Sequence, residues 1–206
     1  MIILTALVAT HDPANATTVT VQIDHSATAF GAGAQTVSSA NASRELAVAY
    51  VAADGATPKQ TVLVRGGGLK WKRVAKSNKQ VGDAEIWSAT TNGAAFSVTA
   101  TPKRPGFDTE LTVVTYTGAA RVRTTAKASA PIGAPTIQLK RKVAGGLASM
   151  VGFDGTNAVN RTVPSNQALL NQNTDSARNT YWAQSMNAVS TGAAKVTLND
   201  LAPTGD

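Results

Sequence analysis

The sequence predicts an all-β protein built as an antiparallel β-sandwich with long loops. Between residues 68 and 118, four apolar runs of strand length are separated by clusters of Gly, Asn, Asp and Pro. Apolar and polar residues alternate within these runs, which indicates strands with one buried face. No long stretch shows the apolar period of a helix.

The composition is compatible with one domain spanning residues 1–206. Hydrophobic residues make up 43% of the chain, but only 15% of residues are charged and 5% aromatic, so Thr, Ser, Asn and Gly must cover much of the surface. Such a surface is typical of secreted and virion β-proteins. The absence of cysteine excludes disulfides, thiolate metal sites and a cysteine nucleophile.

The N-terminal part is expected to hold three strands and one long loop. Residues 1–10 lack the basic start of a signal peptide and run directly into a turn, so we predict a first strand with neither an export signal nor an anchor. Residues 17–23 alternate as a second strand, and residues 45–51 are apolar on both faces, as in a central strand. Residues 26–43 are small and polar and are predicted to be a long loop or arm, suited to a subunit contact.

The middle of the chain contains the clearest strand patterns. Gly66-Gly-Gly68 lacks the phosphate-loop pattern and a following helix, so it predicts a bulge or tight bend. Asn92-Gly93 predicts a hairpin turn. Strands are predicted over residues 60–65, 69–74, 84–88, 96–101 and 110–117.

The C-terminal part predicts a further series of short strands. Residues 165–178 are polar and are predicted to be a loop with at most a single helical turn. Asp154-Gly-Thr-Asn157 marks a turn, and its oxygen atoms are also compatible with calcium, although their spacing is not that of an EF-hand. The strands are predicted over residues 119–128, 136–140, 147–153, 180–186 and 194–199.

Basic residues give the chain a formal net charge of +7 and gather in three groups. This distribution favours an acidic partner, such as nucleic acid, an acidic glycan or an acidic protein surface, while solvated strand faces explain it equally well. The groups are Arg65, Lys70, Lys72, Arg73, Lys76 and Lys79; Arg121, Arg123 and Lys127; and Lys140, Arg141 and Lys142.

Residue types that carry catalysis or bind metals are scarce. The two histidines, His11 and His25, lie near turn residues, and no nucleophile-elbow motif is present. Two pairs of carboxylates are spaced to share a strand face, as the two catalytic carboxylates of a glycosidase would be. Turn formation and charge compensation explain both pairs more simply. We therefore predict no enzymatic activity, no cofactor and no metal site. The carboxylate pairs are Asp83 with Glu85 and Asp108 with Glu110.

Aromatic side chains are the remaining candidates for a binding site. Trp71 lies among basic residues, but alternation places it opposite Lys70 and Lys72, so we predict that it belongs to the core. Tyr181 and Trp182 are adjacent in one predicted strand and point to opposite faces. Packing at the edge of the core is the favoured interpretation for this pair, and one of the two rings is also a candidate for a solvent-facing sugar site or subunit interface.

Six segments between residues 44 and 206 resemble, in their order, a broad group of bacterial and phage domains. The segments are Leu46-Ala-Val-Ala-Tyr50, Gly68-Leu-Lys-Trp-Lys-Arg-Val74, Ala84-Glu-Ile-Trp87, Val113-Val-Thr-Tyr-Thr-Gly118, Asn179-Thr-Tyr-Trp182 and Val196-Thr-Leu-Asn-Asp-Leu-Ala-Pro-Thr-Gly-Asp206. The group consists of jelly-roll or lectin-like β-sandwiches of phage particles and extracellular proteins. The resemblance therefore implies a jelly-roll-like fold and contains no catalytic signature.

The resemblance also implies an open sheet edge. Domains of the group generally continue past the Pro-Thr-Gly-Asp turn into a closing strand, whereas this sequence stops at Asp206. Either that strand is absent, or the first strand replaces it, or a neighbouring subunit supplies it by strand addition.

Two functions are expected from these observations. The first is a phage virion structural protein, a capsid decoration or cement protein made in the host cytoplasm. It would bind the major capsid protein and copies of itself through basic faces and loops. The alternative is a carbohydrate-binding module of a tail fibre or cell-surface protein; nucleic-acid binding ranks last, and no membrane contact is expected. The predicted partner-binding residues are Lys70, Lys72, Arg73, Lys76, Arg121, Arg123, Lys140, Lys142, Tyr181 and Trp182.

Overall fold

The computed structural model describes residues 2–10, 20–40, 44–139, 146–156, 158–186 and 195–201. These residues form fifteen β-strands in antiparallel sheets, and no helix lies among them. Within this part of the chain there is accordingly no helical segment able to cross a membrane. The prediction of an all-β protein is confirmed.

The strands form two five-stranded sheets and two smaller ones. Sheet A has the spatial order β10 (Arg121–Ala130), β1 (Ile2–Thr10), β12 (Leu147–Asp154), β14 (Thr180–Met186) and β13 (Gln167–Thr174). Sheet B has the order β2 (Gln22–Ala32), β9 (Asp108–Thr117), β4 (Leu46–Pro58), β7 (Val81–Thr90) and β6 (Lys72–Ser77). Sheet C is β3 (Gln35–Ser39), β8 (Phe96–Pro102) and β5 (Val62–Gly66), and sheet D is β11 (Thr136–Leu139) with β15 (Val196–Asn199).

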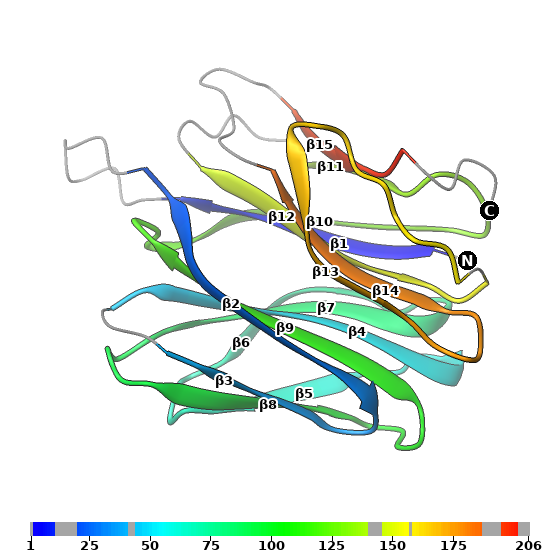
Figure 1. Cartoon of the computed structure of the whole chain (residues 1–206), viewed down its shortest axis with the longest axis horizontal. Coiled ribbons are helices and arrows are strands. Elements are labelled where there is room, and N and C mark those ends of the chain that lie inside the picture. The colour runs from blue at the N-terminus through cyan, green and yellow to red at the C-terminus, as the bar shows by residue number, and fades with distance from the viewer. Residues whose placement is uncertain are drawn as a thin grey trace.

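The four sheets are stacked in the order D, A, B, C (Figure 1). Sheets A and B enclose a central core, sheet D packs on the other face of sheet A, and sheet C packs on the other face of sheet B. Both faces of the inner strands of these two sheets are therefore covered. As a result, every residue of β12 is buried, and so are the first eight residues of β4.

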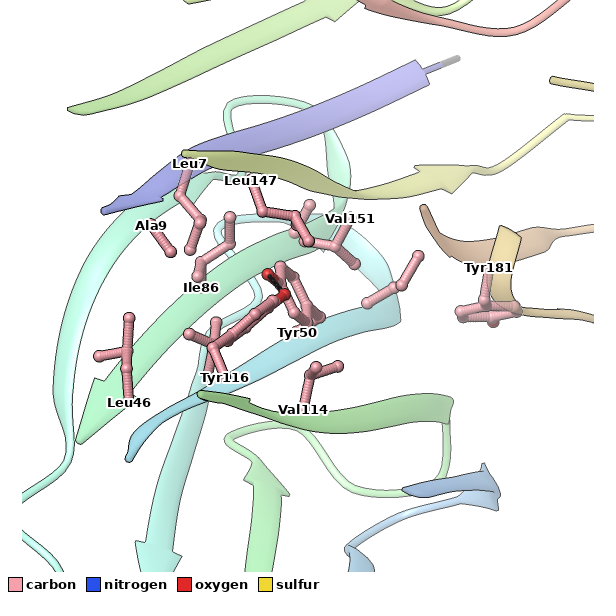
Figure 2. Packing of buried hydrophobic residues seen from close by; sticks show 14 of the residues in the cluster. Leu7, Ala9, Leu46, Tyr50, Ile86, Val114, Tyr116, Leu147, Val151 and Tyr181 are labelled. Carbon is pink, nitrogen blue, oxygen red and sulfur yellow. Dashed lines mark hydrogen bonds between the residues drawn. The ribbon is translucent and has the colours of Figure 1, made fainter. Parts of the chain in front are cut away.

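The central core is built around two tyrosines that meet between sheets A and B (Figure 2). The hydroxyls of Tyr50 and Tyr116 lie 2.6 Å apart, and the Tyr116 hydroxyl also lies 3.2 Å from Ser149 Oγ of sheet A. Leu7 and Val151 pack around them from sheet A. Because each buried phenol has a hydrogen-bond partner, the polar atoms in this core are stabilised rather than left unsatisfied.

The predicted loop over residues 26–43 is wrong, because this segment contains most of β2 and all of β3. Its small residues alternate as in a strand, with Ala27 and Ala29 packed against the core between sheets B and C. The hydroxyl of Thr28 lies 3.0 Å from that of Thr112 on β9. This strand is therefore stabilised by cross-strand hydroxyl pairs and by packed alanines. It lacks the large apolar residues by which a strand is usually recognised in a sequence.

The predicted loop over residues 165–178 is also wrong, because it contains β13. Asn171 and Asn173 each donate a side-chain hydrogen bond of 2.9 Å to Glu110 Oε2 on β9. The polar residues of β13 therefore have partners in sheet B, which its own sequence does not reveal.

The turn at Asn92-Gly93 does not join a hairpin. It connects β7, which pairs with β4 and β6 in sheet B, to β8, which pairs with β3 and β5 in sheet C. The turn signal is real, since Gly93 has a φ of 86°, but the chain passes to another layer instead of returning beside itself.

Candidate functional site

Two of the three basic groups meet at one side of the molecule. β6 is the edge strand of sheet B, and β10 is the edge strand of sheet A. The two edges lie side by side, and Ser77 Oγ on β6 donates a hydrogen bond of 3.3 Å to the carbonyl of Ala128 on β10. Residues that are about fifty positions apart in the sequence thereby share one surface.

The surface between these edges forms a basic groove, which we define by Arg73, Lys76, Lys79 and Lys127. One part, of about 350 Å³, is lined by residues 73–76 and 125–127. A second part, of about 380 Å³, is lined by residues 76–79 and 127–129. Lys76 and Lys127 line both parts, so the two form one groove. No acidic residue is among the residues lining either part.

Both edge strands carry a β-bulge within or near the groove. The pairing of β6 with β7 shifts between Arg73 and Ala75, so Val74 is the extra residue. The pairing of β10 with β1 skips Arg123. Bulges and lysines on an edge strand hinder the addition of a further strand. The groove therefore suits contacts made by cationic side chains better than a backbone ladder.

Glu85 on β7 holds two cations of the basic groove in place. Its carboxylate is fully buried and lies 3.1 Å from Lys76 Nζ and 3.3 Å from an Arg73 Nη. Thr61 Oγ1 donates to it at 2.9 Å and Trp87 Nε1 at 2.8 Å. These contacts restrict the movement of the Arg73 and Lys76 side chains. The Arg73 side chain is nevertheless 41% exposed.

Asp83 and Glu85 share a strand face, as their spacing predicts, and both are buried. Burial and the neighbouring Glu85 charge raise the pKa of Asp83 above its usual value. Burial also opposes ionisation of Glu85, but the hydrogen bond from Asp83 and the charges of Lys76 and Arg73 outweigh it and lower its pKa. At neutral pH Asp83 therefore keeps its proton beside an ionised Glu85. Neither group lines the basic groove, so they have no access to a substrate there.

A second concave surface, which we call the tryptophan pocket, lies where sheets B and C meet. It has a volume of about 490 Å³. The guanidinium of Arg73, at the end of the basic groove, lies 5.5 Å from the centre of the Trp87 ring, so the two surfaces are neighbours. The pocket is lined by Leu63, Val64, Arg65, Gly66, Gly68, Leu69, Lys70, Trp71 and Trp87.

The three-glycine turn shapes one wall of this pocket. Gly66, Gly67 and Gly68 all have positive φ, and a Cβ at Gly66 or Gly67 would collide with β8. The predicted tight bend is confirmed. Trp71 Nε1 donates to the carbonyl of Gly66 at 3.2 Å, which fixes the indole over the turn. Trp71 is half-buried and packs against the core between sheets B and C, so the prediction that it belongs to the core is correct only in part.

Of the remaining predicted partner-binding cations, those that the structure describes are exposed but lie outside the lining of the basic groove. Lys70 lines the tryptophan pocket, and Lys72 is exposed at the start of β6. Arg121 and Arg123 are exposed on β10. Lys140 and Lys142 lie outside the residues that the structure describes.

The favoured interpretation that Tyr181 and Trp182 pack against the core is confirmed, because both are fully buried, and neither is the solvent-facing ring that a sugar site would require. Their side chains do point to opposite faces of β14. Tyr181 lies in the central core near Phe30 and Phe153, whereas Trp182 lies between sheets A and D. Sheet D covers the face that a two-layered sandwich would have left open, so neither ring is available to a glycan.

Buried carboxyls elsewhere serve structural roles. Asp154 Oδ1 accepts hydrogen bonds from the backbone and side chain of Thr156, and its Oδ2 pairs with Arg161, which supports a turn instead of a calcium site. Among the described residues, no group of three or more His, Asp or Glu is arranged to hold a metal ion. His25 is half-buried on β2, and His11 lies outside the described residues.

Replacing Glu110 by Gln is expected to flatten the pH dependence of stability. Burial raises the pKa of Glu110 to about 7, against the hydrogen bonds from Asn173 and Asn171. Between pH 4.5 and about 7 the native state keeps a proton that the unfolded chain has lost, so the wild-type free energy of unfolding falls as the pH rises. Gln cannot ionise, and its carbonyl can accept both bonds.

Urea denaturation from about pH 4.5 to about pH 8 measures this effect. Glu110→Gln should match the wild type at the acidic end and exceed it at the alkaline end, with a slope smaller by roughly 1 kcal/mol per pH unit. Burial raises the pKa of Asp200 to about 7 as well, so part of the slope should remain. A variant with the full wild-type slope would show that Glu110 ionises normally.

The predicted partner-binding residues did not include Arg65, Lys79, Lys127 and Trp87, although the first three belong to the basic groups of the sequence. The signal available for Trp87 was the Glu85-Ile-Trp87 spacing, which places the indole on the same face as the buried carboxylate. No protein-family model, curated protein or solved structure matches this chain. Its function must accordingly be argued from the basic groove and the tryptophan pocket.

Proposed function

We propose that this chain is a structural protein of a phage particle, a capsid decoration protein that attaches through the basic groove. The observation that supports it most directly is the convergence of Arg73, Lys76 and Lys79 with Lys127 in one groove that no acidic residue lines. Such a groove is complementary to an acidic protein surface. The partners in this proposal are the major capsid protein and further copies of the chain, and the location is the virion.

The same proposal includes the jelly-roll-like sandwich and the absence of catalysis. Two five-stranded antiparallel sheets stacked face to face are compatible with such a sandwich. Asp83 and Glu85 are both buried, and Glu85 holds Arg73 and Lys76 in place, which favours adhesion over hydrolysis. A carbohydrate-binding module built on Tyr181 or Trp182 is less favoured, since both rings are buried.

Particles purified from the producing host test the proposal. We expect quantitative mass spectrometry to find the chain in a stoichiometric amount relative to the shell protein. We also expect a higher salt concentration to release the chain from the particles, because salt screens exposed ion pairs. Rebinding of Lys79→Gln/Lys127→Gln to salt-stripped particles should be weaker by about tenfold. Arg178→Gln/Lys195→Gln removes the same charge from exposed positions outside the groove and should rebind normally. Absence from particles, or equal rebinding of both double variants, would refute the proposal.

A further inference from the structure

We propose that the tryptophan pocket binds an acidic saccharide, a sugar ring that bears a carboxylate or a sulfate. This site is separate from the basic groove and does not depend on the particle role. Its volume of about 490 Å³ lies within the range of roughly 300–1,000 Å³ that is common for small-ligand sites.

The two indoles supply rigid apolar surface without free donors. Trp71 Nε1 is bonded to the carbonyl of Gly66 at 3.2 Å, and Trp87 Nε1 is bonded to Glu85 Oε2 at 2.8 Å. Both rings are half-buried and pack against the core between sheets B and C. The Arg73 guanidinium lies over the Trp87 ring, 5.5 Å from its centre. The exposed part of Trp71, together with the part of Trp87 that Arg73 leaves open, therefore offers fixed aromatic surface on which the C–H face of a sugar ring can stack.

The polar side chains of the pocket select for negative charge. Its lining contains no Asn, Gln, Ser, Thr, Asp or Glu, the residues that would exchange hydrogen bonds with the hydroxyls of a neutral sugar. The only side-chain donors besides the occupied indoles are Arg65 and Lys70, and both are exposed. A ligand gains strong polar contacts here by presenting a carboxylate or sulfate to these cations.

The same lining disfavours the other polyanions. Sequence-specific reading of a nucleobase needs hydrogen bonds to its edges, for which this pocket has no amide or carboxylate side chain. A base that stacks without such reading is the competing occupant, and an oligothymidylate probe tests it. An acidic peptide strand could pair with β5, the edge strand of sheet C that lines the pocket, but such pairing by itself would leave the two indoles unused. A ring with an apolar face and one anionic group satisfies both the indoles and the cations.

Calorimetric titration with four oligomers tests this inference. The probes are a galacturonate tetramer, its methyl ester as the matched neutral compound, a heparin-derived tetrasaccharide and a short oligothymidylate. We expect binding of at least one acidic saccharide, and about tenfold weaker binding of the ester than of the galacturonate if the carboxylate is the preferred group. The heparin-derived probe distinguishes sulfate from carboxylate as the preferred anion.

Variants locate the binding in the pocket. Arg65→Gln/Lys70→Gln should weaken binding by about tenfold or more, and Trp71→Ala should weaken it while Trp71→Phe retains most of it. Lys79→Gln/Lys127→Gln in the basic groove and Arg178→Gln/Lys195→Gln should bind as the wild type does. Failure of every acidic saccharide to bind at millimolar concentration would overturn the inference. So would oligothymidylate binding that is tighter than saccharide binding and lost in Trp71→Ala.

Discussion

Replacing Arg161 by Met is expected to lower the free energy of unfolding by about 3–5 kcal/mol at neutral pH. The Arg161 side chain is completely buried, pairs with Asp154 and lies 3.9 Å from Asp200 Oδ2. Its guanidinium also stacks over the Trp182 ring at 4.5 Å. Met fills a similar volume but leaves the fully buried Asp154 without its guanidinium partner, and an uncompensated buried charge is strongly destabilising.

The deficit should shrink as the pH falls. Burial raises the pKa of Asp154, but the bond and charge of Arg161 outweigh it and hold the pKa below its usual value. In the wild type, the stabilisation by this pair is complete above the ordinary carboxyl pKa and is lost in acid. In Arg161→Met the folded Asp154 takes up a proton more readily than the unfolded chain, so the variant gains stability as the pH falls.

Chemical denaturation at neutral pH and near pH 4.5 measures both effects, with Asp154→Asn/Arg161→Met/Asp200→Asn as the matched control. This triple variant removes the buried charges together and should be less destabilised than Arg161→Met. A single variant that loses under about 1 kcal/mol, or loses equally at both pH values, would contradict the buried ion group.

Replacing Gly152 by Ala is expected to lower the free energy of unfolding by about 3 kcal/mol. A Cβ at this position of β12 would lie less than 3.0 Å from several atoms of the Trp182 indole. Trp182 is fully buried between sheets A and D, and its Nε1 donates to Gln184 Oε1 at 3.0 Å. The ring therefore has no free space into which to move.

Three further variants test the packing explanation. Gly133→Ala meets no atom within 4 Å but, unlike Gly152, has a positive φ, +108°, so it should show only the strain of that conformation, about 1 kcal/mol. Trp182→Leu in the Gly152→Ala background should recover part of the loss relative to Trp182→Leu alone. Thermal unfolding measures the stability of the four variants and of the wild type. A Gly152→Ala variant as stable as the wild type would contradict the contact with the indole.

Local pattern was sufficient for strands that carry large apolar residues. The alternation or apolar runs of residues 45–51, 147–153 and 180–186 correspond to β4, β12 and β14. Strands made of small or polar residues were missed, because their stabilisation comes from other strands. Thr28 pairs with Thr112, and Asn171 with Glu110, at sequence separations that no local pattern conveys.

The candidate sites show the same division. Composition identified the basic residues, and the alternation of Lys70, Trp71 and Lys72 correctly separated exposed cations from a partly buried ring. Nothing in the sequence placed Lys76 beside Lys127 or Trp71 beside Trp87, because these neighbours depend on which strands form the edges of sheets A and B.

By itself, then, the sequence determined the all-β class, the position of most strands and the excess of positive charge. Alternation and turn residues act over a few neighbouring positions, so one chain segment is enough to reveal them. Only the tertiary structure decided the number of layers, and with it the burial of Tyr181 and Trp182 and the joining of two basic groups into one groove. Sheet stacking and the choice of edge strands arise from contacts between distant segments, which have no local signature.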